Sequence, residues 1–393
     1  MNTLMFSIHS RFLAKQLSPL SVKEIIDELN ITPSPLGERI SHSNIRISMV
    51  NLPVICYKNS RTFIEDMNSY VAKAVAERSQ LVCFPQYTGL LPLTIFSMYD
   101  QLEETVENAL LERDEPTLKR MGDLFCKLLS STIFDFYYNT FALLAIKHNI
   151  YIQAGSVLLK TSRGLVNRAF LFAPNGEAIL QQDKLYPNEQ EKMLGVVAGT
   201  HIKVAETLLG NIAVVIGEDN RYFEPYRLAS SQGCKIVIAP SGGENFTTIK
   251  YYRSTAPMRS QENRLYSVQS VLLYNLLPMK GQGIGGFYCP YQLTKTGDGI
   301  LSYLKEPGVL SARLDVDSLV RLVDTYTADS NSVVYRLLAE QYQRVFGIIP
   351  PSTPNQAGAQ FLLGDDTFDE SLSPVNKDII SKEDDCNDDE TTI

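Results

Sequence analysis

The sequence predicts an α/β protein, and three neighbouring stretches carry that prediction. Residues 45–50 alternate as a β-strand does, residues 61–79 place apolar side chains at helical spacing, and residues 81–85 form the short apolar run of a buried strand. Strand, helix and strand in this order indicate a βαβ unit. The chain has 393 residues, 44% of them apolar and 20% charged, so a sizeable core is expected.

Other elements follow from the same patterns. A helix is expected over 21–30, because Ser21 and Glu24 have the spacing of a capping box, and Pro33 and Pro35 end it before the main domain. An acidic helix is expected over 100–120, inside what looks like an insertion. Apolar periodicity and turn residues further predict helices over 136–148, 224–231, 258–263 and 332–346, and strands over 151–157, 168–173, 178–181, 212–216, 235–240, 267–273 and 311–315.

The net charge of −8 is concentrated at the C-terminus. Residues 365–393 contain eleven acids and two lysines, so the rest of the chain is almost neutral. We expect this tail to be disordered, and we expect no nucleic-acid partner because the remainder has no basic stripe. The predicted organisation is a helical N-terminal extension (1–43), a main domain (44–330), a C-terminal helix with a Pro-rich segment (331–362) and the acidic tail (363–393).

Localisation and cofactors are inferred from what the sequence lacks. It has no stretch of about 18 uncharged apolar residues, and its first 20 residues lack the apolar core of a secretory signal. Its six cysteines are scattered without a CxxC pair or histidine partners, which favours reduced thiols over disulfides or a zinc site. We expect a cytoplasmic protein with no membrane partner, metal or cofactor.

Four segments, taken in order, resemble the nitrilase superfamily of carbon–nitrogen hydrolases. Residues 81–87 are similar to a family strand ending in Phe-Pro-Glu-Tyr, and residues 183–187 to the segment that carries the family's lysine. Residues 215–224 are similar to the nucleophile turn, usually Ile-Cys-Tyr-Asp-Ile-Arg-Phe-Pro-Glu. Residues 239–241, with 259–263, resemble further family stretches. The resemblance implies an α-β-β-α sandwich over about 44–330, with N- and C-terminal extensions, in a homodimer or higher homo-oligomer.

The resemblance also implies a set of site residues. The family uses a cysteine nucleophile, a glutamate general base, a lysine that stabilises negative charge on the substrate oxygen, and a second glutamate that positions substrate and lysine. Lys184 matches the lysine, and Glu191 the second glutamate, with Glu189 as its alternative. Gln86 stands at the base position and Gly217 at the nucleophile position. Glutamine has no proton chemistry near neutral pH, and glycine cannot form an acyl-enzyme.

Two observations support the loss of the nucleophile. The register at position 217 is anchored by Asp219, Arg221 and Glu224, which match the flanking family residues. The remaining cysteines offer no replacement: Cys83 is expected on the strand face opposite to Gln86, and Cys234 begins a different strand. The chain is therefore interpreted as a divergent member without the catalytic cysteine and glutamate.

Three functions remain open at this point. The first is a pseudoenzyme that binds a small ligand, anionic or carbonyl-bearing, or a protein partner in the degenerate pocket, with Glu218 and Asn220 as further binding residues. The second is an amidase or carbamoyl hydrolase that acts on carbon–nitrogen bonds other than peptide bonds, with Glu218 or Glu191 activating water. The third is a structural or interaction protein, in which the dimer surface, the acidic helix and the tail are what matter.

Overall fold

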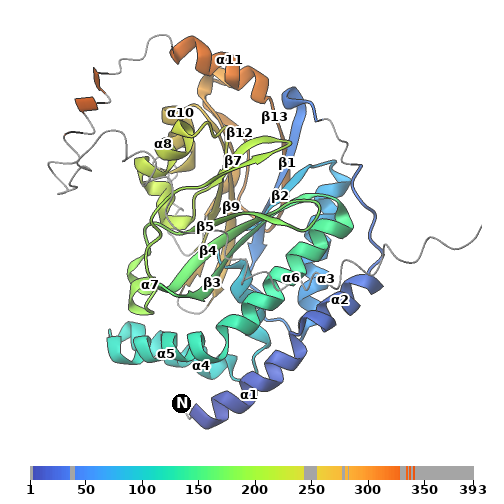
Figure 1. The fold of residues 1–393 in the computed structure, drawn as a ribbon, viewed down its shortest axis with the longest axis vertical. Coiled ribbons are helices and arrows are strands. Elements are labelled where there is room, and N and C mark those ends of the chain that lie inside the picture. The colour runs from blue at the N-terminus through green and yellow to red at the C-terminus, as the bar shows by residue number, and fades with distance from the viewer. Residues whose placement is uncertain are drawn as a thin grey trace, which may run out of the picture. The chain divides into compact units, whose positions relative to one another are not determined.

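The computed structural model describes residues 3–35, 40–242, 255–276, 279–281 and 283–327, with a few isolated residues between 333 and 340 (Figure 1). The chain divides into two compact units, Met1–Val320 and Arg321–Ile393. The acidic tail and most of the helix expected over 332–346 lie outside the described residues. Within those residues, no helix is long and apolar enough to cross a bilayer.

One half of the sheet system contains the βαβ unit that the sequence predicts. β1, β2 and β3 run parallel, and β4, β5 and β13 are antiparallel to their neighbours. In the order in which they pair, the strands are β5 (Ala178–Asp183), β4 (Gly164–Phe172), β3 (Tyr151–Thr161), β2 (Leu81–Cys83), β1 (Ile45–Pro53) and β13 (Gly308–Leu314).

The other half repeats the parallel arrangement in β7, β8 and β9. It joins the first half where Leu52 of β1 pairs with Leu272 of β9. Its strands are β6 (Val204–Thr207), β7 (Gly210–Val214), β8 (Ile236–Ser241), β9 (Tyr266–Leu276), β10 (Met279–Gly281), β11 (Gly285–Tyr288) and β12 (Ile300–Leu304).

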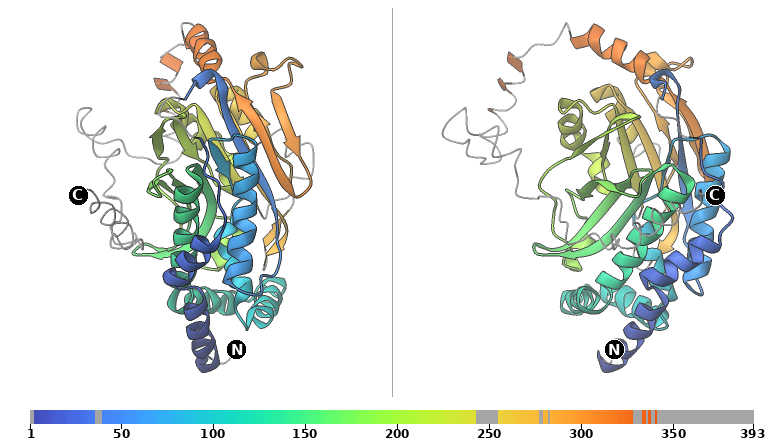
Figure 2. Two further views of the ribbon diagram at one scale, coloured as in Figure 1. Left: turned by 90° about the vertical axis from the view of Figure 1, so that its right-hand side faces the viewer. Right: turned by 45° about the vertical axis from the view of Figure 1, so that its right-hand side comes forward.

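Helices cover the outer faces of the two halves. α3 (Ser60–Ala76) and α6 (Ser130–His148) pack on the first half, where Phe84, just after β2, lies against Phe141 of α6. α8 (Phe223–Ser231) and α10 (Ala256–Asn263) pack on the second half. Figures 1 and 2 show the strands between these two pairs of helices. The predicted α-β-β-α sandwich is therefore confirmed.

The N-terminal extension differs from the prediction. α2 (Pro19–Glu28) starts before the expected capping box, because Ser18 is its N-cap and accepts the Ser21 N–H, with proline in the first turn. α1 (Thr3–Gln16) was not predicted. Its apolar residues lie on two faces rather than one, since Phe6 is buried while Phe12 is 65% exposed, so no single apolar stripe marks the helix.

The acidic segment expected to be helical over 100–120 is helical, but it forms two helices rather than one. The segment forms α4 (Tyr99–Leu111) and α5 (Glu115–Leu128), separated by Arg113 in the left-handed region and by Asp114, which caps α5 by accepting the Thr117 N–H. The other predicted helices and strands within the described residues are present, with ends shifted by a few residues. Not predicted were β6, β10, β11 and β12, α7 (Glu189–Met193) and α11 (Val316–Thr327), and the short 3-10 helices η1 (His42–Asn44), η2 (Thr88–Ile95), η3 (Gly217–Arg221) and η4 (Tyr291–Leu293).

Candidate functional site

The residues that the sequence singles out follow the C-terminal ends of strands. Gln86 lies three residues after β2, Lys184 directly follows β5, and Gly217 opens η3 after β7. Glu191 lies in α7, the short helix that follows Lys184. Carboxyl ends of strands are where open α/β sheets bind their ligands, so the topology favours a site here.

The turn that carries Gln86 is held tightly against β3. Gly155 forms a bulge in β3 with φ +73°, and a Cβ at this position would lie 2.0 Å from the Pro85 carbonyl oxygen. The Tyr87 N–H donates to Ser156 Oγ at 3.1 Å, while Tyr87 itself adopts φ +65°. A left-handed tyrosine is uncommon and strained, which is typical of residues whose side chain must be aimed at a site.

Lys184 and Glu191 form a fully buried ion pair. Lys184 Nζ lies 2.8 Å from Glu191 Oε2, and neither side chain has exposed surface. The backbone of Lys184 is fixed as well, because its N–H donates to the Asn167 carbonyl of β4 at 2.9 Å. Glu189, the alternative to Glu191, is exposed at the start of α7.

Four donors surround the Glu191 carboxylate. Oε1 accepts from the Tyr87 hydroxyl at 2.7 Å and from Asn167 Nδ2 at 2.8 Å, and Oε2 accepts from Lys184 and from the Asn188 N–H at 2.9 Å. Burial by itself would raise the pKa of Glu191, but Lys184 and the hydrogen bonds from Tyr87 and Asn167 lower this pKa below its ordinary value. Glu191 is therefore a fixed carboxylate.

The Gln86 side chain completes this group. With its amide oriented to satisfy both ends, the oxygen accepts from Asn167 Nδ2 at 2.9 Å and from Lys184 Nζ at 3.2 Å, and it lies 3.0 Å from the Tyr87 hydroxyl, whose proton is donated to Glu191. Its nitrogen donates to the Gly242 carbonyl at 3.1 Å. A carboxylate in this place would set an oxygen against that carbonyl, so the position suits an amide. We call Gln86, Tyr87, Asn167, Lys184 and Glu191 the polar cluster.

Asp219 ties the Gly217 turn to the lysine segment. Its two carboxylate oxygens accept the N–H groups of Leu185 and Tyr186, each at 2.7 Å. Burial raises the pKa of Asp219 to about 7, although these N–H groups and Lys184 act in the opposite direction. Gly217 has φ +52°, a conformation that glycine adopts without strain.

Glu218 and Asn220 contact residues of the same turn and of the following helix, α8. Glu218 pairs with Arg221 at 3.0 Å, and both side chains are partly exposed. Asn220 Nδ2 donates to the Gly217 carbonyl at 2.9 Å, and its oxygen accepts from the Tyr226 hydroxyl at 2.5 Å. The binding role of Glu218 and Asn220 stays a prediction.

Three site residues were missed by sequence reasoning. Tyr87 lies beside Gln86 in the recognised segment, but nothing in the sequence indicates that its hydroxyl reaches Glu191. Asn167 lies within β4 and has no local signal, because its role depends on α7 folding back over the strand. Asp219 was used only to anchor the register, although its two backbone contacts hold the site together.

The cysteines of the described residues carry no activated thiol. Cys83, Cys234 and Cys289 are buried, and burial raises the pKa of each, to about 12 for the last two. Burial also raises the pKa of the half-buried Cys126 and of the exposed Cys56. Reactive cysteines have lowered pKa values. In the same part of the chain, no group of three or more histidine, cysteine, aspartate or glutamate residues is placed to hold a metal ion.

Comparison with known proteins gives the family. The carbon–nitrogen hydrolase profile matches residues 46–288, which is more than half of the chain, and the chain therefore belongs to this family. Over 171 residues it is 32% identical to the probable hydrolase YhcX of Bacillus subtilis (strain 168), a match that covers 42% of this chain and 33% of that protein. Over 211 residues it is 25% identical to nitrilase 2 of Arabidopsis thaliana, covering 53% of this chain and 58% of that protein. The matches thus span about a third and just over half of these relatives.

A solved structure supports the fold independently. A double mutant of the amidase from Nesterenkonia sp. AN1, with a glutamate replaced by glutamine and a cysteine by alanine, was determined in complex with acrylamide. It aligns with 77% of this chain and all of its own length, with a TM-score of 0.54 and 18% sequence identity. At this identity the similarity concerns the fold, and it agrees with the α-β-β-α arrangement described above.

Proposed function

We propose that this protein is a non-hydrolysing carbon–nitrogen hydrolase homologue that binds a small amide or other carbonyl-bearing ligand at the polar cluster. One observation carries the proposal. The lysine, the second glutamate and their partners form a complete buried hydrogen-bonded group, while glycine stands at the nucleophile position and glutamine at the base position. This is the arrangement expected where binding is kept and covalent chemistry is lost.

The ligand class follows from the donors of the cluster. Lys184 presents a buried ammonium whose pairing with Glu191 leaves the group close to neutral overall. Such a group can donate to a carbonyl or carboxylate oxygen in a site shielded from water, where a charge-assisted hydrogen bond is strong. The amidase double mutant noted above, in which glutamate is replaced by glutamine and cysteine by alanine, was solved with an amide, acrylamide, which supports this class.

The alternative of thiol-free hydrolysis is less well supported. Glu191 already accepts four hydrogen bonds and has a lowered pKa, so it is a poor base for activating water. Glu218 faces Arg221. No specific observation on the described surfaces favours an interaction role. The expected homodimer is a separate proposal, which a measurement of the molecular mass in solution would test.

The test is calorimetric titration with acetamide and butyramide, together with an assay for released ammonia. We expect binding of at least one amide without ammonia release. Lys192→Met, which removes an exposed lysine of α7, should bind as the wild type does. The double variant Lys184→Met/Glu191→Gln, which removes both buried charges, should lose binding. Amide hydrolysis by the wild type, or binding that persists in the double variant, would contradict the proposal.

A further inference from the structure

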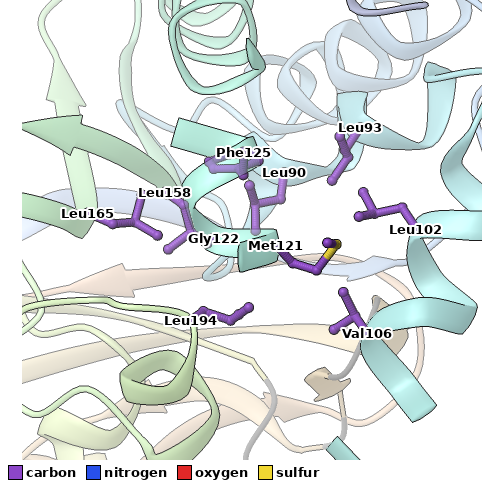
Figure 3. Close-up of a pocket in the computed structure, with 10 residues that line it drawn as sticks. All are labelled: Leu90, Leu93, Leu102, Val106, Met121, Gly122, Phe125, Leu158, Leu165 and Leu194. Carbon is purple, nitrogen blue, oxygen red and sulfur yellow. The ribbon is translucent and has the colours of Figure 1, made fainter. Parts of the chain in front are cut away.

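An apolar pocket lies under the inserted helices α4 and α5 (Figure 3). Its cavity volume is about 50 Å³, and every residue that lines it is leucine, valine, methionine, phenylalanine or glycine. Val106 of α4 and Met121 of α5 form one side, and strands β3 and β4 contribute Leu158 and Leu165. A cavity with this apolar lining does not favour water, because it offers no hydrogen-bond partner.

The strand side of the pocket borders the polar cluster. Leu165 lies two positions before Asn167 on β4, so both side chains are on the same face of that strand. Leu158 of β3 is paired in register with Asn167. Directly opposed residues in an antiparallel pair have Cβ atoms roughly 5 Å apart. The pocket and Asn167 of the polar cluster therefore share one surface of β3 and β4.

Two further elements make the same connection. Leu90 follows Tyr87 by three residues at the start of η2, which is one turn of a 3-10 helix. Leu194 follows Glu191 by three residues at the end of α7, where positions three apart are neighbours. In each case the residue of the polar cluster and the residue of the pocket are three positions apart, with one of them capping the helix that contains the other.

The inserted helix α5 is packed closely enough to form a wall. A Cβ on Gly122 would lie 2.1 Å from the Leu194 carbonyl oxygen, so α5 meets the end of α7 at a distance that only glycine allows. Phe125, one turn later on α5, and Leu194 are partly exposed, so the pocket has an edge toward solvent.

We propose that this pocket is an apolar subsite that takes the aliphatic chain of the ligand whose carbonyl end binds the polar cluster. The proposal rests on the proposed function and names its ligand class more narrowly, as an aliphatic amide. About 10–15 Å³ of such cavity volume accommodates one water-sized group. The pocket therefore accepts a chain of roughly three to five carbon-sized groups.

The test is the affinity of acetamide, butyramide, hexanamide and octanamide for the wild-type protein and for pocket variants. Burial of each methylene should tighten binding about fourfold until the pocket is filled, after which affinity levels off. Val106→Phe, which fills the pocket, should keep acetamide affinity and lose the gain with chain length. Val320→Phe, at a valine that is 36% exposed on α11, is the matched control and should retain the gain.

Further measurements keep the result interpretable. Val106→Leu is a smaller filling variant that should shorten the gain if the phenylalanine variant does not fold. Xenon, followed by its NMR chemical shift, should bind the wild type and not Val106→Phe. Equal affinity of acetamide and hexanamide, or a gain unchanged in Val106→Phe, overturns the subsite and leaves the proposed function standing. Failure of every amide to bind overturns the proposed function and the subsite with it.

Discussion

Lys184 and Glu191 lie 2.8 Å apart with no exposed surface on either side chain, and the carboxylate of Glu191 also accepts hydrogen bonds from Tyr87, Asn167 and the Asn188 N–H. Removing two charges from water is unfavourable, and only good geometry with further hydrogen bonds offsets that penalty. This pair has both. The binding proposed at the polar cluster depends on this pair.

The first prediction concerns this pair. Lys184→Met leaves the Glu191 charge buried without its counterion, so we expect the free energy of unfolding to fall by about 3–5 kcal/mol. Adding Glu191→Gln should recover part of the loss, because the uncompensated charge disappears. Urea unfolding measures both. Lys23→Met removes the ion pair between Lys23 and Asp27, which has a similar length but lies on the surface of α2. There a change in the free energy of unfolding of about 0.3–0.5 kcal/mol is expected. Equal effects of the two lysine substitutions would refute the buried pair.

The second prediction concerns pH. The pKa of Asp219 is raised from an ordinary 3.8 to about 7, so between these values the folded protein binds more protons than the unfolded chain. The contribution of Asp219 to stability is therefore fully present below pH 3.8 and is lost as the pH rises through 7. Relative to Asp219→Asn, the wild type should lose up to about 1.4 kcal/mol per pH unit in this window.

Unfolding of both proteins at pH 5, 6, 7 and 8 checks this prediction. Comparing the wild type with Asp219→Asn removes the opposite trend of His148, which is present in both proteins. Burial lowers the pKa of His148 to about 4, so its contribution to stability grows with pH. Parallel curves for the two proteins would show that Asp219 stays ionised across the range, held by the N–H groups of Leu185 and Tyr186.

The sequence predicted the frame of the molecule well because the frame depends on local patterns. β1 is marked by alternation of its residues, β8 by an apolar run and α3 by helical spacing, so their positions follow directly. α1 was missed because it is apolar on two faces. The break between α4 and α5 was missed because it depends on the left-handed conformation of Arg113.

Only the site residues that lie within recognised sequence motifs could be predicted. Lys184, Gln86 and Gly217 lie in recognised segments, and Lys184 and Gln86 prove to be in contact. Asn167 could not be found, because its place depends on the pairing of β3 with β4 and on the contact between β4 and Glu191 of α7. The apolar pocket likewise depends on α5 meeting Leu194, a tertiary contact that has no sequence signal beyond Gly122.

The third prediction concerns the bulge of β3 under the Gln86 turn. Gly155→Ala adds a Cβ where Pro85 O lies 2.0 Å away, in a left-handed conformation of φ +73°. Gly195→Ala is the matched control, since its φ is +89° and nothing lies within 4 Å of the added Cβ. Both should lose about 1–2 kcal/mol through the backbone. Gly155→Ala should lose roughly 1–3 kcal/mol more through overpacking, and should weaken amide binding as well. Equal losses in thermal and urea unfolding would mean that the turn is not held by close approach.

The fourth prediction concerns catalysis. The wild type should release no ammonia from butyramide by a thiol-dependent route, because Gly217 offers no nucleophile and Gln86 accepts no proton. Gly217→Cys alone should give a thiol with little turnover, since a general base is worth about 10²–10⁴-fold. The cysteine also takes on a left-handed conformation at φ +52°, at a loss of about 1–2 kcal/mol in stability.

Adding Gln86→Glu to Gly217→Cys should raise turnover above that of the single variant. The new carboxyl would lie between the Gly242 carbonyl and Lys184, and it would supply the proton acceptor that glutamine lacks. Iodoacetamide provides the check, because it should abolish turnover of the double variant. If the wild type turns over amide and alkylation abolishes this activity, another cysteine is the nucleophile. If the activity survives alkylation but disappears in Glu218→Gln, water activation is established instead. Either result would end the interpretation of this chain as a binding protein.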